Sequence, residues 1–175
     1  MLKRFLLIMA GCGLIVSSCE KASRDESTAS GNRSQIANTG EKLPDFTLKT
    51  LAGDKINLRR LEGEKIVVVN FWATWCGPCR REIPDFNRVY SRYRNRGVEI
   101  LGISVDQSPE TEVPPFMKKN PIAYPVLIGS PELTLRYGVR ALPTTFIIDH
   151  SGKIRRRIIG MTSAATLEAE LEKLL

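Results

Sequence analysis

The chain has few of the side chains that a metal centre needs. Its 175 residues contain one histidine, His150, and four cysteines. Cys12 and Cys19 lie close to the N-terminus, which leaves Cys76 and Cys79 for a folded domain. A structural zinc site takes about four ligands. The sequence therefore predicts no metal and no other cofactor, and His150, which follows a predicted turn, is interpreted as a surface residue.

Aromatic residues are also scarce, at 7% of the chain, and few of them lie among the basic residues. The formal charge is +7, and its one tight cluster is Arg155-Arg156-Arg157. This pattern favours a solvated basic surface over a nucleic-acid interface, so we expect no nucleic-acid partner. Weak attraction to anionic lipid headgroups stays open as an alternative.

No long hydrophobic run is present that would cross a bilayer comfortably. The nearest, residues 5–16, follows the basic pair Lys3-Arg4, and this combination is typical of a secretory signal. We expect the signal to occupy residues 1–18.

The end of this segment is Val16-Ser17-Ser18-Cys19, which resembles the lipobox of bacterial lipoproteins. The resemblance implies that Cys19 is lipidated and anchors the protein to a bacterial membrane on its extracytoplasmic, periplasmic face. Cys12 is a competing match, but it leaves only residues 5–9 as the hydrophobic region. An ordinary cleaved signal is the remaining alternative.

Residues 19–41 are polar, and Ile36 is the one large apolar residue between Glu20 and Glu41. Such a segment buries too little surface to order itself, so it is predicted to be a flexible tether. The remaining residues, 42–175, are enough for one domain with a real core.

The centre of this domain is a pair of cysteines at a predicted strand-to-helix junction. Residues 66–71 are short, apolar and β-branched, as in a buried strand, and Pro78 suits the first turn of a helix. Backbone N–H groups and the helix dipole would stabilise a thiolate at Cys76. Cys79, one turn further along, can then close on a mixed disulfide. A purely structural disulfide is less favoured, because so short a loop constrains little of the chain.

The motif Trp75-Cys76-Gly77-Pro78-Cys79 resembles the active site of the thioredoxin superfamily. Leu142-Pro143-Thr144 resembles the cis-proline loop that faces this motif in that superfamily. The two resemblances imply an α/β thioredoxin fold, with a central mixed sheet flanked by helices. They also imply that Cys76 attacks and Cys79 resolves, and that Trp75, Gly77, Pro78, Leu142 and Pro143 contact the substrate.

Two further patterns resemble the TlpA/ResA-like branch of the superfamily. They are the entry Pro44-Asp45-Phe46-Thr47-Leu48 and the run Cys79-Arg80-Arg81-Glu82-Ile83-Pro84. The branch implies an N-terminal β-hairpin, a central insertion and a membrane-anchored thiol:disulfide oxidoreductase. Its members commonly act as reductants of extracytoplasmic proteins, some of them on apocytochrome c, and receive electrons from a membrane thiol donor.

The same resemblance places Glu82 beside the active site, where its carboxylate could hold the proton of Cys79. Asn70 stands where ordinary thioredoxins have a buried aspartate, and an amide cannot relay a proton, which favours a role for Glu82. The alternative is an exposed glutamate in the first turns that merely suits the helix dipole.

The other expected elements follow from periodicity and turn residues. They are a hairpin within residues 43–61, a helix from about residue 76 kinked at Pro84, strands at 98–105, 124–128, 145–148 and 153–159, a short helix at 115–119, and helices at 131–137 and 163–175.

Two rival functions remain. A thiol peroxidase is suggested by the peroxiredoxin-like Pro44-Asp45-Phe46 entry. Its motif needs proline seven and threonine three residues before the reactive cysteine, where this chain has Val69 and Ala73. The second rival is a non-catalytic redox-sensing lipoprotein, which turnover measurements would distinguish.

Overall fold

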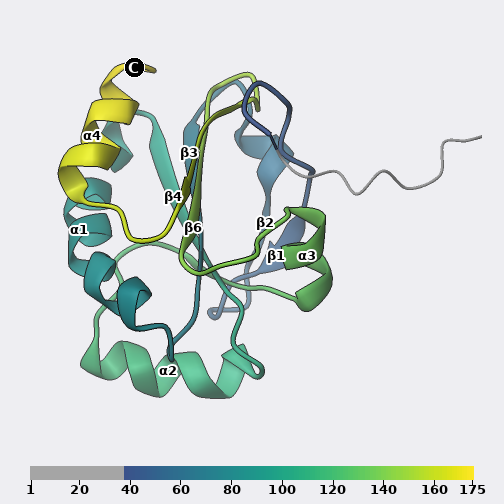
Figure 1. Cartoon of the computed structure of the whole chain (residues 1–175), viewed down its shortest axis with the longest axis vertical. Coiled ribbons are helices and arrows are strands. Elements are labelled where there is room, and N and C mark those ends of the chain that lie inside the picture. The colour runs from purple at the N-terminus through teal and green to yellow at the C-terminus, as the bar shows by residue number, and fades with distance from the viewer. Residues whose placement is uncertain (1–37) are drawn as a thin grey trace, which may run out of the picture. The chain divides into compact units, whose positions relative to one another are not determined.

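The computed structural model describes residues 38–175, and its centre is a five-stranded sheet in the order β5-β4-β3-β6-β7. In that order the strands are Val126–Ile128, Val98–Ser104, Ile66–Trp72, Thr144–Ile148 and Ile154–Ile159. β3, β4 and β5 run parallel, whereas β6 and β7 are antiparallel to their neighbours. The sheet is mixed and helices flank it (Figure 1), which confirms the predicted fold class.

The central strand β3 is buried over all of its seven residues. Since side chains alternate along a strand, Val67, Val69 and Phe71 enter one hydrophobic core and Ile66 and Val68 enter another. This strand therefore supplies both faces of the sheet.

One face is covered by α1 (Gly77–Tyr93) and α4 (Ala164–Glu172), which lie side by side in Figure 1. The helix expected from about residue 76 is α1, and its Ile83, Phe86 and Tyr93 side chains are buried. Pro84 lies inside α1 and is exposed. The carbonyl that it leaves without an intrahelical donor is therefore on the solvent side, where water can bind it.

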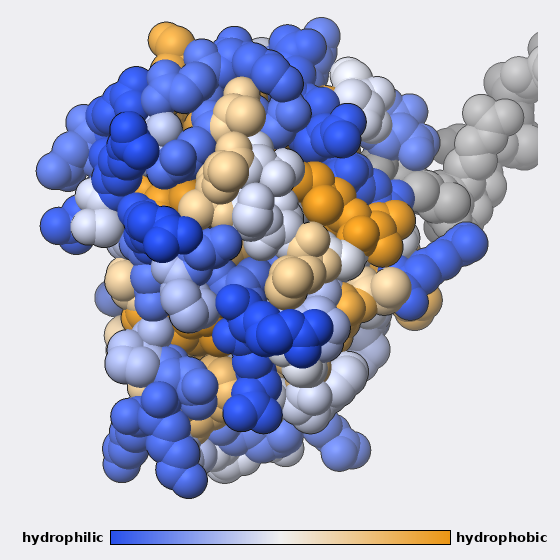
Figure 2. Space-filling view, turned by 60° about the vertical axis from the view of Figure 1, so that its left-hand side comes forward, coloured by the Kyte–Doolittle hydropathy of each residue, from blue (hydrophilic) through white to orange (hydrophobic). Residues whose placement is uncertain are grey.

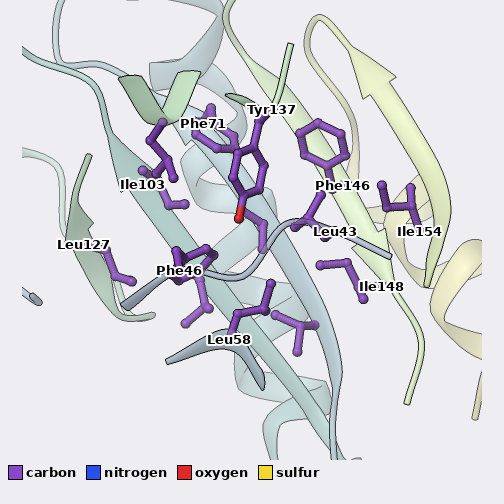
Figure 3. Packing of buried hydrophobic residues seen from close by; sticks show 14 residues of the cluster. Leu43, Phe46, Leu58, Phe71, Ile103, Leu127, Tyr137, Phe146, Ile148 and Ile154 are labelled. Atoms are coloured by element: carbon purple, nitrogen blue, oxygen red, sulfur yellow. The ribbon is translucent and has the colours of Figure 1, made fainter. Parts of the chain in front are cut away.

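The opposite face carries the predicted hairpin, the 3-10 turn η1 (Leu58–Leu61) and α3 (Pro131–Arg136). The hairpin strands, β1 (Thr47–Lys49) and β2 (Lys55–Asn57), pair antiparallel. Tyr137 lies at the centre of this core, with its ring centroid 5.4 Å from that of Phe71. Figure 3 shows its hydroxyl pointing toward the segment that carries Leu43 and Phe46, where it donates a hydrogen bond to the Pro44 carbonyl. The chain after α3 is thereby fixed to the sheet.

The prediction of a short helix at 115–119 is wrong, because α2 extends over Pro109–Lys119. Pro109 occupies the first turn, where its missing N–H costs nothing. Pro114 and Pro115 are exposed, as are the residues at 110 and 111 whose carbonyls lose their donors. Val113 is buried, so packing and hydration together keep the helix continuous.

The expected signal and lipobox, with Cys19, and the tether up to residue 37 lie outside the described residues. Just before residue 42, the backbone already pairs with β7, because Gly40 donates to the Ile154 carbonyl at 2.8 Å and Ile154 donates to the Glu41 carbonyl at 2.9 Å. Within residues 38–175, none of the helices has the length and apolar character needed to cross a membrane.

Candidate active site

The two cysteines of the motif form a disulfide at the start of α1. Cys76 is the N-cap of this helix in extended conformation, and its Sγ accepts a hydrogen bond from the Cys79 backbone N–H at 3.3 Å. Sulfur at this position lies where the N–H groups of the first turn converge, so a thiolate of Cys76 would be stabilised there. Both residues are buried, and they pack with Trp72 and Ile83 in one hydrophobic cluster.

The loop that leads from β3 into the motif is held by Asp106. Its carboxylate accepts from the Thr74 backbone N–H at 3.1 Å and from the Thr74 hydroxyl at 2.6 Å. The Ser104 hydroxyl donates to the same carboxylate at 2.7 Å. Asp106 is buried just after β4, so it fixes the backbone directly before Trp75. Asp106 was not among the predicted site residues. The signal was an aspartate at the carboxyl end of the strand parallel to β3.

An open cleft of about 610 Å³ lies beside the disulfide. Its first wall is the active-site motif, with Trp75, Cys76, Gly77 and Pro78. Its second wall is α3 and the chain after it, with Pro131, Thr134, Val139, Arg140, Ala141 and Leu142. The Leu142–Pro143 peptide bond is cis, as expected from the resemblance. Trp75 is 67% exposed, which leaves its indole free at the edge of the cleft.

The predicted site residues therefore fall into two groups. Trp75, Cys76, Gly77, Pro78 and Leu142 meet at the cleft, whereas Pro143, predicted to contact the substrate, is buried and does not line it. Cys79 and Glu82 lie on the inner side of α1 and do not line the cleft. His150 is exposed in the turn after β6, as predicted.

Glu82 is 2% exposed, so the alternative of an exposed glutamate is wrong. Its Oε1 accepts from the Asn70 amide at 2.9 Å, and its Oε2 accepts from the Thr162 backbone N–H at 3.1 Å. Burial raises the pKa of this carboxyl to about 7, although both hydrogen bonds act in the opposite direction. The side chain is three residues after Cys79, which places it on the same side of the helix with Cβ atoms about 5 to 6 Å apart.

The neighbours of Glu82 explain why it is held in place. Asn70 projects from β3 toward α1, and its amide also donates to the Thr145 hydroxyl at 3.0 Å. Burial, and then the charge of Glu82, raise the pKa of Tyr124, which indicates that this ring also lies in the same interior. The arrangement can hold one ionisable proton behind the disulfide.

Known proteins resemble the chain over most of this domain. Residues 39–157 match the AhpC/TSA family. This chain belongs to the AhpC/TSA family. Among its relatives, a thiol-disulfide oxidoreductase ResA of Bacillus cereus is 40% identical over 136 residues, which are 77% of this chain and 78% of ResA. A ResA of Geobacillus thermodenitrificans is 39% identical over 136 residues, 77% of each chain.

Solved structures agree with this AhpC/TSA assignment. A thiol:disulfide interchange protein of the thioredoxin family from Chlorobium tepidum TLS has a TM-score of 0.69 and 35% identity, over 78% of this chain and 97% of that one. StoA from Bacillus subtilis has a TM-score of 0.63 and 27% identity, over 72% and 95%. The ResA-like resemblance and the thioredoxin fold are confirmed, and the protein is a thiol-disulfide oxidoreductase.

Proposed function

We propose that this oxidoreductase reduces disulfides in partner proteins outside the cytoplasm while anchored to a membrane by Cys19. The observation that carries the dithiol–disulfide exchange is the asymmetry of the cysteine pair. Both are buried, but Cys76 lines the cleft, whereas Cys79 does not and lies on the helix side that also bears Glu82.

In the first step the reduced protein presents Cys76 as a thiolate at the N-terminus of α1. The thiolate attacks one sulfur of the partner's disulfide, a mixed disulfide forms, and the partner's other sulfur leaves as a thiolate that takes a proton from water. Trp75, Gly77, Pro78 and Leu142, which line the cleft, are proposed to hold the partner's backbone beside this sulfur.

In the second step Cys79 attacks Cys76 Sγ within the mixed disulfide. Its thiol must first lose a proton, and Glu82 is proposed to accept it, because a carboxylate with a pKa of about 7 is balanced between its two forms near neutral pH. The Cys76–Cys79 disulfide forms, and the partner's second sulfur leaves reduced. Two electrons have then passed to the partner.

The direction of electron flow is proposed from the motif and from the resemblance. Gly77 and Pro78 are shared with thioredoxin, whose potential is about −270 mV, on the reducing side. A membrane thiol donor would then regenerate the dithiol. Apocytochrome c is the candidate partner that the ResA resemblance suggests.

Trapping tests the attack by Cys76 and identifies the partner. Cys79→Ala cannot resolve the mixed disulfide, so partners should accumulate on Cys76 and be released by dithiothreitol. The matched control is Cys76→Ala, which retains one cysteine of the motif but should trap nothing. If Cys76→Ala accumulates the partners instead, the two roles are reversed.

Anchoring is tested separately with the native leader in place. The wild-type protein should incorporate labelled fatty acid and fractionate with membranes, and Cys19→Ala should abolish the label. Labelling that persists in Cys19→Ala and disappears in Cys12→Ala would move the lipid to Cys12.

A redox sensor would share the disulfide and the anchor but not the turnover. Repeated reduction of insulin disulfides in the presence of excess dithiothreitol separates the two functions. A sensor would leave the rate at that of dithiothreitol alone.

A further inference from the structure

The cleft beside the disulfide has one charged residue in its lining. That residue is Arg140, at the end of the chain segment that follows α3. Its side chain is exposed and makes no hydrogen bond or ion pair with any of residues 38–175. The neighbouring lining residues Val139, Ala141 and Leu142 are apolar. A guanidinium group is therefore available at an otherwise largely apolar binding surface.

A second guanidinium lies close to the other wall. Arg81 Nη1 is 3.7 Å from the position that a Cβ atom on Gly77 would occupy, and Gly77 lines the cleft. Arg81 is exposed and has no ion-pair partner among the described residues. The first turn of α1 carries no acidic residue, although the helix dipole favours anions and disfavours cations at this end.

The acidic groups nearby do not neutralise these two arginines. The carboxylate of Asp106 is already occupied by Thr74 and Ser104. Glu132 is the one acidic residue between positions 130 and 142, and it does not line the cleft. The surface around the disulfide consequently keeps a local positive charge.

Few large hydrophobic side chains are exposed on residues 38–175. The large hydrophobic side chains exposed on the described residues are five: Trp75, Leu135, Ile159, Met161 and Leu175. On the face drawn in Figure 2, hydrophobic side chains form small patches separated by hydrophilic ones. Charge next to the disulfide is thus a means by which this surface can discriminate between partners.

We propose that the cleft selects an extended substrate segment that has an acidic residue next to its disulfide cysteine. The substrate carboxylate pairs with the Arg140 guanidinium, which suits a bidentate contact. Arg81 adds to the positive field at the opposite wall. A cleft of about 610 Å³ has room for a few side chains of such a segment. The inference rests on the proposed reduction of protein disulfides and names the substrate class.

Binding tests it without requiring turnover. The affinities of two peptides for the oxidised protein would be compared. Both peptides carry serine in place of the reactive cysteine, and they differ only in whether Glu or Gln stands next to that serine. Trp75, exposed at the edge of the cleft, reports binding by fluorescence. The Glu peptide should bind roughly two- to fivefold more tightly, the change expected for one exposed ion pair. Arg140→Gln and, separately, about 1 M NaCl should remove that advantage.

Arg60→Gln is the matched control. Arg60 is exposed on η1, which precedes β3, whereas the disulfide follows the other end of that strand. This variant makes the same change of charge and should keep the preference for the Glu peptide. Arg81→Gln should reduce the preference less than Arg140→Gln does.

Equal binding of the two peptides to the wild-type protein would overturn the inference, as would a preference that survives in Arg140→Gln. Binding that depends on Arg140 only with vesicles of anionic phospholipid, and not with either peptide, would also overturn it. The corresponding disulfide peptides then separate this result from the proposed function. If the protein binds the Glu peptide selectively but reduces neither disulfide peptide, only the proposed reductase function is refuted. If it reduces both disulfide peptides with equal kcat/KM, only the proposed selectivity for an acidic residue is refuted.

Discussion

The two faces of the central sheet bury different chemistry. The face under the hairpin and α3 is lined by apolar and aromatic side chains, and the hydroxyl of Tyr137 is satisfied by the Pro44 carbonyl. The face under α1 buries Glu82 with Asn70 and Thr145. Both faces use side chains of β3, which point alternately to the two sides.

The apolar face therefore contributes mainly to stability, and the polar face contributes to the chemistry of the cysteines. The apolar face holds α3 and the following chain, which form one wall of the cleft. The polar face keeps a carboxyl with a pKa of about 7 on the helix that begins with the reactive cysteines. Substitutions on the first face should therefore alter stability without pH dependence, and a substitution of Glu82 should alter both pH dependence and turnover.

The largest effect is expected for Phe71→Ala on the apolar face. Phe71 is fully buried and its ring lies against Tyr137 and Phe146. Its truncation should reduce the free energy of unfolding by about 3 to 5 kcal/mol, measured by urea denaturation. The loss should be the same at pH 5 and pH 8, and a loss confined to one pH would contradict the separation of the two faces.

Next in size is the pH dependence of stability that Glu82 confers. Its pKa is raised from 4.5 to about 7 in the folded protein, so the folded state binds the proton more tightly than the unfolded state. The contribution of Glu82 to the free energy of unfolding is present in full below pH 4.5. It decreases by about 3 kcal/mol as the pH rises to 7. Glu82→Gln should lack this decrease.

Urea unfolding of the oxidised proteins between pH 4 and pH 8 measures the difference. Glu110→Gln, a change of an exposed residue on α2, is the control and should follow the wild type. Parallel curves for wild type and Glu82→Gln would show that burial does not perturb this carboxyl. Glu82 is also buried, and its hydrogen bonds join α1 to β3 and to the chain before α4.

Turnover of Glu82→Gln should fall by roughly 100-fold near neutral pH, the lower end of the range for a lost proton acceptor. The defect should lie in resolution by Cys79, seen as slower release of a labelled partner from the mixed disulfide. Alkylation of Cys76 by iodoacetamide tests the first step and should not slow. If alkylation of Cys76 slows in Glu82→Gln and resolution is unchanged, Glu82 acts on Cys76 and not on Cys79, which contradicts the proposed mechanism.

The smallest effect is expected for Tyr137→Phe. This change keeps the ring packing and removes the hydrogen bond to Pro44, which should cost about 1 kcal/mol. Because Tyr137 fixes the chain that bears Val139 and Arg140, KM for a disulfide peptide should rise more than kcat falls. Unchanged stability and KM would show that aromatic packing alone holds this wall.

The sequence was sufficient for the elements whose signals are local. The β-branched run at 66–71 corresponds to β3, and the helix expected from about residue 76 corresponds to α1. The cysteine motif predicted the redox chemistry, since two cysteines at a helix start need few distant contacts to react. The boundaries of α2 could not be predicted, because its prolines are tolerated only where the backbone carbonyls that lose their donors face solvent.

The tertiary structure decided which polar residues have functions that depend on burial. Glu82 has the same local sequence whether it faces water or the sheet, and only the packing of α1 on β3 and on the chain before α4 raises its pKa. Asp106 acquires its role because β4 ends beside β3, 32 residues away from Thr74 in the chain. Arg140 is placed in the cleft by the position of α3 on the sheet. Desolvation and long-range contacts create these properties, and neither is encoded in the spacing of neighbouring residues.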